Sequence, residues 1–515
     1  MARRAGAISG PVAAGAVFGL ILAALGAVAV RADWPVTFGA ADWSVLRFTL
    51  WQATLSALFS VGLAIPVARA LARRRFVGRG ALVTLLGAPF ILPVIVAVLG
   101  LLAVFGRAGW ASQGLGLLGL PPLSIYGLTG VVLAHVFFNM PLATRLILQG
   151  WQTIPAEQFR LTAQLGLPPQ TVFRTLEWPL LCRVVPGAFA LVFVICLTSF
   201  AVALTLGGGP RATTIELAIY QAFRFDFDLG RAAVLSLVQL AVAGGAALLA
   251  VWILPPVLAS VGRDRPVQRW DAGGVLARGL DTGWITLAAL FLIMPLAAVA
   301  GSGLIGLGQM PGVVWHAAWT SLWVAVLSTG LLVALALPVA AWVAQSTWRG
   351  AEAMTLLGLA ASPLMIGTGW FILIYPFAAP VDFALPVTAL VNAMMALPFA
   401  VRILRPAIQQ VLADHGRLGL GLGLHGWALW RIVLLPRIRP QLGFAAGLAA
   451  ALSVGDLGVL TLFADAETAT LPLQMYRLMG SYRTDAAAGA ALLLLVLAFG
   501  LFWICDAWGR RHAGR

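Results

Sequence analysis

Long apolar runs, separated by short polar segments, follow one another from the start of the chain to its end. Each run holds about twenty residues, enough for a helix to cross the roughly 30 Å hydrocarbon core of a bilayer. The short alternating segments of a membrane β-barrel do not appear in this pattern. The pattern therefore predicts an all-α polytopic membrane protein with twelve transmembrane helices, near residues 10–30, 46–71, 81–105, 125–148, 184–206, 231–254, 283–301, 315–343, 353–377, 384–402, 441–463 and 486–506.

Composition agrees with the pattern and narrows the function classes. Of the 515 residues, 61% are hydrophobic and 10% are charged, with a mean hydropathy of +0.96, which excludes a water-soluble globular protein. The net charge of +15 comes from arginines clustered between apolar runs and not from a basic domain, so we expect no nucleic-acid partner. Three cysteines lie in or beside apolar runs without CxxC spacing, and we interpret them as packing residues; no metal and no cofactor is predicted.

The arginine clusters also predict the orientation in the membrane. Basic residues are enriched in cytoplasmic loops, and Arg73, Arg74, Arg75 and Arg79 follow the second run. The same side would hold the loops 149–183 and 403–440 and both termini, in the inner membrane of a bacterium. The opposite side would hold the acidic Asp226, Asp228, Asp465 and Glu467.

The first apolar run, Val12 to Val30, follows Arg3 and Arg4 and could be a signal peptide. It is long for the apolar region of such a peptide, so we expect a retained first helix.

Segment 259–282 contains Pro266, four arginines and the pair Gly273-Gly274, which are typical of a joint between domains. It would divide the chain into a first half, residues 1–258, and a second half, residues 283–515. Six crossings return the chain to the side on which it started, so the halves are predicted to be parallel repeats.

The two cytoplasmic loops repeat one another. Residues 141–179 and 398–436 align without a gap and share twelve identical residues in 39 positions, including Gly166 with Gly423 and Arg174 with Arg431. We call 149–183 the first repeated loop and 403–440 the second repeated loop.

Each repeated loop contains an amphipathic stretch whose apolar ridge suits a groove in a partner, although a helix lying on lipid or packing under the bundle would have the same pattern. Two equivalent elements on one face fit a two-fold symmetric partner. The ridges consist of Val172, Phe173 and Leu176, and of Trp427, Trp430 and Leu434.

The spacing within the repeated loops resembles the EAAxxxG and IxLP signature of binding-protein-dependent ABC importer permeases. Here the signature glycines are Gly166 and Gly423 and the endings are Leu176–Pro179 and Val433–Pro436, while the EAA triplets are replaced by RLT and RLG. In that family the loop docks into an ATP-binding subunit. The resemblance therefore implies coupling residues Arg160, Gly166, Phe173, Arg174, Pro179, Arg417, Gly423, Trp430, Arg431 and Pro436.

Three further stretches are similar to thiamine ABC transporter permeases: residues 199–233, LSVGDLGVLTLF (452–463) and GSYRTD (480–485). The resemblance implies a permease with two fused halves, a pair of ATP-binding subunits on the cytoplasmic face, a periplasmic substrate-binding protein and thiamine or its phosphate esters as cargo. The fused iron(III) importer permeases have the same architecture and are an alternative.

No lysine occurs in the chain, so no P-loop of the form GxxxxGK[ST] can exist in it. No HExxH or GxSxG motif occurs either. We therefore expect a conduit and not an enzyme, with ATP hydrolysis on separate subunits. A secondary transporter with six-plus-six repeats is the alternative from another class, but it would not need the two repeated loops.

Ionisable residues inside apolar runs are rare and usually face a cavity. Asp456 lies in the eleventh run, and the 257-residue offset between the repeated loops pairs it with Ser199 in the fifth. We expect both to line the translocation pathway, where Asp456 would suit a cationic substrate. The alternative is an aspartate that caps a helix break beside Gly455 and Gly458.

The outer segments TIELAIY (214–220) and TLPLQMY (470–476) also repeat, and they are amphipathic. They could receive a substrate-delivering protein, although packing against the bundle is the plainer alternative. The expected rim contacts are Glu216, Tyr220, Arg224, Tyr476, Arg477 and Arg483.

Overall fold

The computed structural model describes residues 5–32, 39–209, 212–253, 269–270, 273–346, 362–463 and 468–511. Within these ranges every regular element is a helix, so the predicted all-α fold is confirmed. Ten helical segments of the described residues are long and apolar enough to cross a membrane, at 10–31, 40–73, 94–117, 128–152, 169–197, 229–250, 275–309, 312–345, 380–421 and 484–510.

The predicted count of twelve is therefore not confirmed, and two of the predicted spans have no counterpart among the ten. The span at 353–377 is represented by the shorter α16 (Pro363–Ile374), and residues 347–361 lie outside the described part of the chain. The span at 441–463 is divided by a break at residues 455–459, and its helix α19 (Leu435–Val454) carries Arg437 and Arg439 near its start.

The first half, as far as it is described, consists of α1 (Ala5–Arg31), α2 (Ala40–Arg73), α3 (Arg79–Leu85), η1 (Ala88–Phe90), α4 (Val94–Phe105), α5 (Trp110–Leu117), α6 (Leu128–Gln152), α7 (Ala156–Gln164), α8 (Pro169–Val172), the π-helical turn η2 (Phe173–Glu177), α9 (Trp178–Leu197), α10 (Ala201–Leu206), α11 (Ile215–Arg224) and α12 (Leu229–Ile253).

The second half consists of α13 (Val275–Gly306), η5 (Leu307–Gln309), α14 (Gly312–Gln345), α16, η6 (Pro380–Phe383), α17 (Ala384–Gly421), α18 (Trp427–Leu429), the π-helical turn η7 (Trp430–Leu434), α19, α20 (Leu460–Phe463), α21 (Leu471–Gly480) and α22 (Thr484–Arg510). The predicted joint lies largely in residues 254–268 and 271–272, which are outside the described part, so the boundary between the halves stays a prediction.

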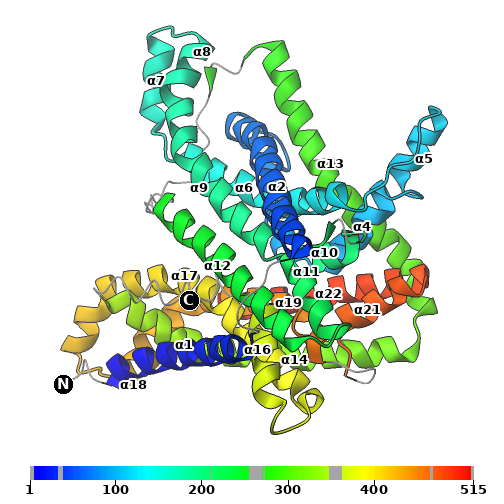
Figure 1. Ribbon diagram of the computed structural model, residues 1–515. Helices are drawn as coiled ribbons and strands as arrows, with labels where there is room; N and C mark the ends of the chain where they lie inside the picture. The colour runs from blue at the N-terminus through cyan, green and yellow to red at the C-terminus, as the bar shows by residue number, and fades with distance from the viewer. Residues whose placement is uncertain are drawn as a thin grey trace.

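The halves are packed crosswise. Helix α1 of the first half lies against α14 and α16 of the second, while α13 of the second half lies against α2 and α4 of the first. Figure 1 shows α10, α11 and α16 near the middle of the molecule and α7 and α8 projecting at its edge. The crosswise arrangement ties each half to the other through its own first helix.

Glycines allow the close approach at both crossings. A Cβ added to Gly369 on α16 would fall against the carbonyl of Ala24 on α1, and one added to Gly100 on α4 would lie 2.6 Å from the Pro295 carbonyl on α13. Acyl chains are as apolar as the helix surfaces, so the hydrophobic effect does not drive helices together within a bilayer. Their association is stabilised mainly by close van der Waals packing of this kind.

We expect Gly369→Val to separate α1 from α16 and to lower the stability of the purified protein by about 1–3 kcal/mol, as overpacking does. The melting temperature in detergent measures this. Gly26→Val is the matched control, since a Cβ at Gly26 on α1 meets nothing within 4 Å. Equal melting temperatures of the two variants would contradict the close approach.

Candidate functional site

A cavity of about 370 Å³ lies where the two halves meet. It is lined by the segment before α4, the α9–α10 break, the start of α16, one face of α17 and the α19–α20 break. Both residues predicted for the pathway, Ser199 and Asp456, line this cavity. Each lies two residues beyond the end of its helix, so the breaks are equivalent in the two halves.

Asp456 caps the helix break and also lines the cavity; its role in a translocation pathway stays a prediction. Its Oδ1 accepts the backbone N–H of Gly458 at 3.1 Å, which caps the break. Its Oδ2 is buried and has no hydrogen-bond partner among the described residues. One carboxyl oxygen is therefore used by the fold and the other remains available in the cavity.

Glu216 was predicted as a rim contact for a soluble protein, and this prediction is wrong. Its side chain is fully buried, lines the cavity, and accepts a hydrogen bond at 2.8 Å from the hydroxyl of Ser362 at the start of α16. The reason is the anchoring of α11. The Thr49 hydroxyl on α2 accepts the N–H of Ile215 at 2.9 Å and holds the start of α11 inside the bundle.

The other predicted rim residues differ in their exposure to solvent. Tyr220 is 9% exposed and its ring packs edge-to-face against Phe200, so it is also too buried for a rim contact. Tyr476 and Arg477 are half-buried. Burial raises the pKa of the Tyr220 and Tyr476 phenols above their ordinary value. Only Arg224 and Arg483, near the ends of α11 and α21, are exposed.

The sequence analysis missed two exposed aromatic residues beside these arginines. Phe227 is 80% exposed and Tyr482 is 90% exposed, and each lies two residues before the start of the next helix, α12 or α22. Their φ angles are +53° and +58°, and no other non-glycine residue in the described ranges has a positive φ. Aromatic residues rarely adopt this conformation, so composition gave no signal for it.

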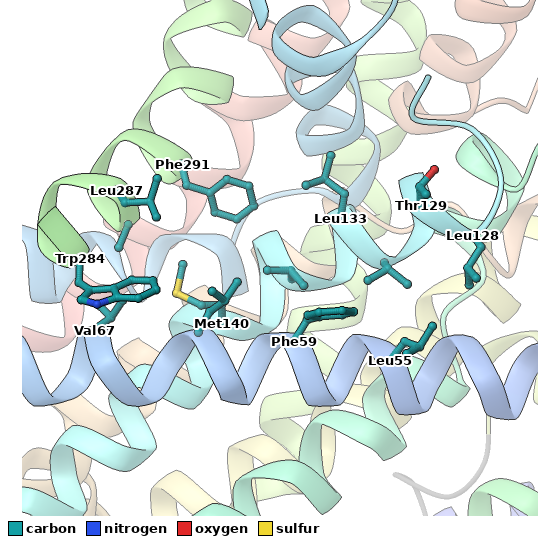
Figure 2. A pocket seen from close by; sticks show the side chains of 14 residues that line it. Leu55, Phe59, Val67, Leu128, Thr129, Leu133, Met140, Trp284, Leu287 and Phe291 are labelled. Carbon is teal, nitrogen blue, oxygen red and sulfur yellow. The ribbon is translucent and has the colours of Figure 1, made fainter. Parts of the chain in front are cut away.

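A second cavity, of about 450 Å³, lies between α2, α6 and α13. Figure 2 shows its lining, with Phe59 on α2, Met140 on α6 and Trp284 on α13 among the side chains that face the space. Thr129 is the one polar residue of the lining. Although this cavity is the larger, it offers no charged group to a polar cargo, so the cavity between the halves is the candidate site.

The two repeated loops share a backbone motif at their glycines. Gly166 and Gly423 have φ of +61° and +74°, and the N–H groups of Leu167 and Leu424 return to the carbonyls of Thr162 and Gly419 at 3.1 and 3.0 Å. This is a Schellman motif, in which the residue after the helix is left-handed and is usually glycine. A Cβ at either glycine would meet nothing within 4 Å, so backbone strain alone favours glycine there.

The apolar ridges proposed from the sequence are largely turned inward. Val172 and Leu434 are buried, and Phe173 and Trp430 pack against the core. Trp427 of the second ridge is the exception, at 74% exposed. Exposed leucines flank the Schellman motifs as well, and they match in the two loops: Leu161 with Leu418 (54% and 63% exposed) and Leu165 with Leu422 (63% and 70%).

The charged and proline positions predicted for coupling are at the surface. Exposed residues of the two repeated loops include Arg160, Arg174, Pro179, Arg417, Arg431 and Pro436. A partner could therefore reach them together with the four leucines.

The repeated loops differ in charge at one buried position. Glu177 at the end of η2 is fully buried, and it pairs with Arg69 at 2.8 Å and with Arg269 of the predicted joint at 2.6 Å. The Arg269 guanidinium also lies 4.1 Å from the ring centre of Phe159 on α7. The corresponding residue of the second loop is the buried Leu434. The first repeated loop is thus fixed to the joint by charge, and its counterpart is fixed by apolar packing.

Two equivalent surface loops on a helical membrane bundle, with a polar cavity between its halves, define a membrane permease. Thiamine transport system permease proteins (ThiP) from Brucella suis, Salmonella typhimurium and Escherichia coli are 42%, 41% and 41% identical to the chain. The matches cover 92%, 92% and 90% of this chain and 89%, 90% and 88% of those proteins. The chain belongs to the family of thiamine transport system permease proteins and is the permease subunit of an ABC importer in the inner membrane.

A shorter relative matches slightly less than half of the chain. The molybdenum transport system permease protein ModB of Mycobacterium bovis is 30% identical over 88% of its own length but only 45% of this chain. The iron(III) alternative receives no support from these relatives. No protein-family model matches the chain.

Removing the charge of Glu177 takes away the carboxylate that pairs with Arg69 and with the 3%-exposed side chain of Arg269. Breaking a buried ion pair in this way costs about 3–5 kcal/mol. We therefore expect Glu177→Gln to lower the melting temperature of the purified permease clearly. Glu157→Gln, on the exposed face of α7, is the control and should change nothing; a stable Glu177→Gln variant would show that the cluster does not fix the loop.

Proposed function

We propose that this chain is the conduit through which thiamine or its phosphate esters enter the cytoplasm, driven by ATP hydrolysis on separate subunits. The observation that carries the proposal is the match, over nine-tenths of the chain, to proteins named as thiamine transport system permeases. The cavity between the halves supports it, because Asp456 can pair with the permanently cationic thiazolium ring of thiamine. In this proposal the repeated loops and both termini face the cytoplasm.

Two copies of an ATP-binding subunit would dock on the repeated loops. The matched leucines at 161 and 418, and at 165 and 422, give each copy the same apolar contact, and Arg174 and Arg431 give each the same charge. Exposed leucines placed twice in the same way suit a partner that is itself two-fold symmetric. This arrangement would convert the closure of the ATP-binding subunits into movement of the two halves.

The proposal is tested by uptake into proteoliposomes that hold the permease with its ATP-binding subunits and its soluble binding protein. Labelled thiamine should accumulate only with ATP, and ATP hydrolysis should rise with thiamine or thiamine pyrophosphate and not with iron(III). Stimulation of ATP hydrolysis by iron(III) alone would contradict thiamine as the cargo. Uptake without ATP would contradict the ATP-driven mechanism.

Docking of the ATP-binding subunits predicts that Leu165→Asp and Leu422→Asp each weaken their retention by the permease, by tenfold or more for a buried apolar contact replaced by charge. Co-purification and ATP-dependent uptake measure the effect. Leu118→Asp, an exposed leucine after α5 on the opposite side of the membrane in this topology, is the matched control. Retention unchanged in both loop variants would remove the leucines from the interface.

On the outer side, the soluble binding protein would dock on Phe227 and Tyr482 together with Arg224 and Arg483. A left-handed conformation costs an L-residue roughly 1–2 kcal/mol, and the Schellman motifs of the repeated loops avoid this cost with glycine. Two exposed aromatic side chains kept in this conformation at matching places indicate a role other than stability. Aromatic residues and arginine are also the residues that most often dominate binding energy at interfaces.

This docking surface predicts that a glycine substitution at either aromatic residue lowers affinity for the binding protein without lowering thermal stability. Phe227→Gly or Tyr482→Gly should leave the melting temperature unchanged or raise it, because the strain is relieved, while affinity for the binding protein falls about tenfold or more. Phe377→Gly, at an 89% exposed aromatic residue without positive φ, should lower stability slightly and leave affinity intact. Binding that is unchanged in both variants would exclude the aromatic pair from the docking surface.

A further inference from the structure

Two acidic side chains, one from each half, line the cavity between the halves, and each has a carboxyl oxygen that no described residue hydrogen-bonds. Oε1 of Glu216 and Oδ2 of Asp456 are both buried and have no hydrogen-bond partner within the described ranges. Buried carboxyl oxygens are nearly always hydrogen-bonded, and an orphan acceptor has a large free-energy penalty. Two such atoms in one cavity point to a ligand that supplies donors or positive charge.

The surrounding residues do not supply that charge. The lining of the cavity contains Glu216 and Asp456 and no arginine or histidine. The neutral amides of Gln239 and Asn392 lie beside Glu216 and Asp456. One N–H of each amide donates elsewhere, to the Leu197 carbonyl at 2.9 Å and to the Ser453 hydroxyl at 3.1 Å. The acidic character of the cavity is therefore not balanced by its own walls.

The remaining oxygen of Glu216 is held in a fixed position. Its Oε2 receives the only O–H of Ser362, while the Ser362 oxygen accepts the N–H groups of Leu364 and Met365 at 3.2 and 3.4 Å. The start of a second-half helix thus orients an acid of the first half. Oε1 is left for another donor.

The other walls suit a flat, partly polar ligand. Phe200 and Phe399 line the cavity and offer aromatic surfaces, which attract cations and stack on planar rings. Asn392 and Ser453 line it as well, joined by a hydrogen bond of 3.1 Å. Apolar walls with a few fixed polar groups are typical of small-molecule sites.

We propose that the permease itself holds its cargo in this cavity, as a planar organic cation with N–H donors whose charge and amine are bound by Glu216 and Asp456. This inference rests on the proposed function and deepens it, since thiamine combines a thiazolium cation with an aminopyrimidine. The site is single although the halves are repeated, because the repeat places Pro472 opposite Glu216 and Ser199 opposite Asp456. One complex therefore binds one cargo molecule.

The test is equilibrium binding of labelled thiamine to the complex of permease and ATP-binding subunits in nanodiscs, without the soluble binding protein. We expect saturable binding with one molecule per complex. Glu216→Gln and Asp456→Asn should each weaken it by tenfold or more, and Glu216→Asp should restore part of the loss. Asp382→Asn, at an exposed acid before α17, is the control and should bind as the unmodified complex does.

A second readout separates a binding role from a structural one. Thiochrome, the neutral oxidation product of thiamine, should compete poorly with thiamine in the unmodified complex. The preference for the cation should shrink in both the Gln and the Asn variant, which a general loss of folding would not cause. Asp456→Asn provides the result by itself if Glu216→Gln does not fold.

The outcomes distinguish this inference from the proposed function. If the unmodified complex takes up thiamine with ATP and binding protein, but both variants bind thiamine with unchanged affinity and cation preference, the cavity site is wrong and the proposed function stands. Absence of saturable binding to the unmodified complex would also overturn the site. If the unmodified complex takes up no thiamine, the proposed function itself fails.

Discussion

Backbone groups that cannot meet water must be hydrogen-bonded within the protein, and in a bilayer this requirement leaves only helices facing lipid. The rest of the structure depends on it. The chain interrupts its helices at residues 198–200, between α9 and α10, and at 455–459, between α19 and α20. Both breaks line the cavity between the halves, and Asp456 accepts the backbone N–H of Gly458 at the second one. A helix break buried between two halves is also where polar side chains can be retained, so the same requirement that shapes the bundle places the cavity at its centre.

The repeat fixes the backbone more strictly than the side chains. Both repeated loops have a Schellman glycine, a π-helical turn and a following helix at the same offset, yet Glu177 is replaced by Leu434, Asp456 by Ser199 and Glu216 by Pro472. The matched leucines at 161 and 418 and at 165 and 422, and the matched arginines at 174 and 431, face the surface, where an equal contact is needed twice. Glu177, Asp456 and Glu216 instead lie inside the bundle or against the joint, where a single copy of a charge is enough.

The sequence predicted the all-α fold, ten of the spans, the repeat and the two cavity-lining residues, because hydropathy and a fixed offset report directly on membrane crossing and duplication. It could not predict the burial of Glu216, since an amphipathic stretch shows that two faces differ but not which element covers the polar one. For the same reason it did not predict that Val172 and Leu434 of the two apolar ridges are buried, whereas Trp427 is exposed as expected. The strained Phe227 and Tyr482 gave no signal, because left-handed positions are recognised in a sequence by glycine or asparagine.

The crosswise packing of α1 and α13 has a consequence for how such a protein can evolve. Two separate copies of one half-length chain could build the same bundle, but every acid in such an assembly would appear twice, related by the two-fold axis. Near that axis, the two copies of a buried carboxylate would face each other and repel. Joining the halves in one polypeptide removes this restriction: each half can mutate alone, and an asymmetric cargo can meet an asymmetric cavity inside a scaffold that remains symmetric for its partners.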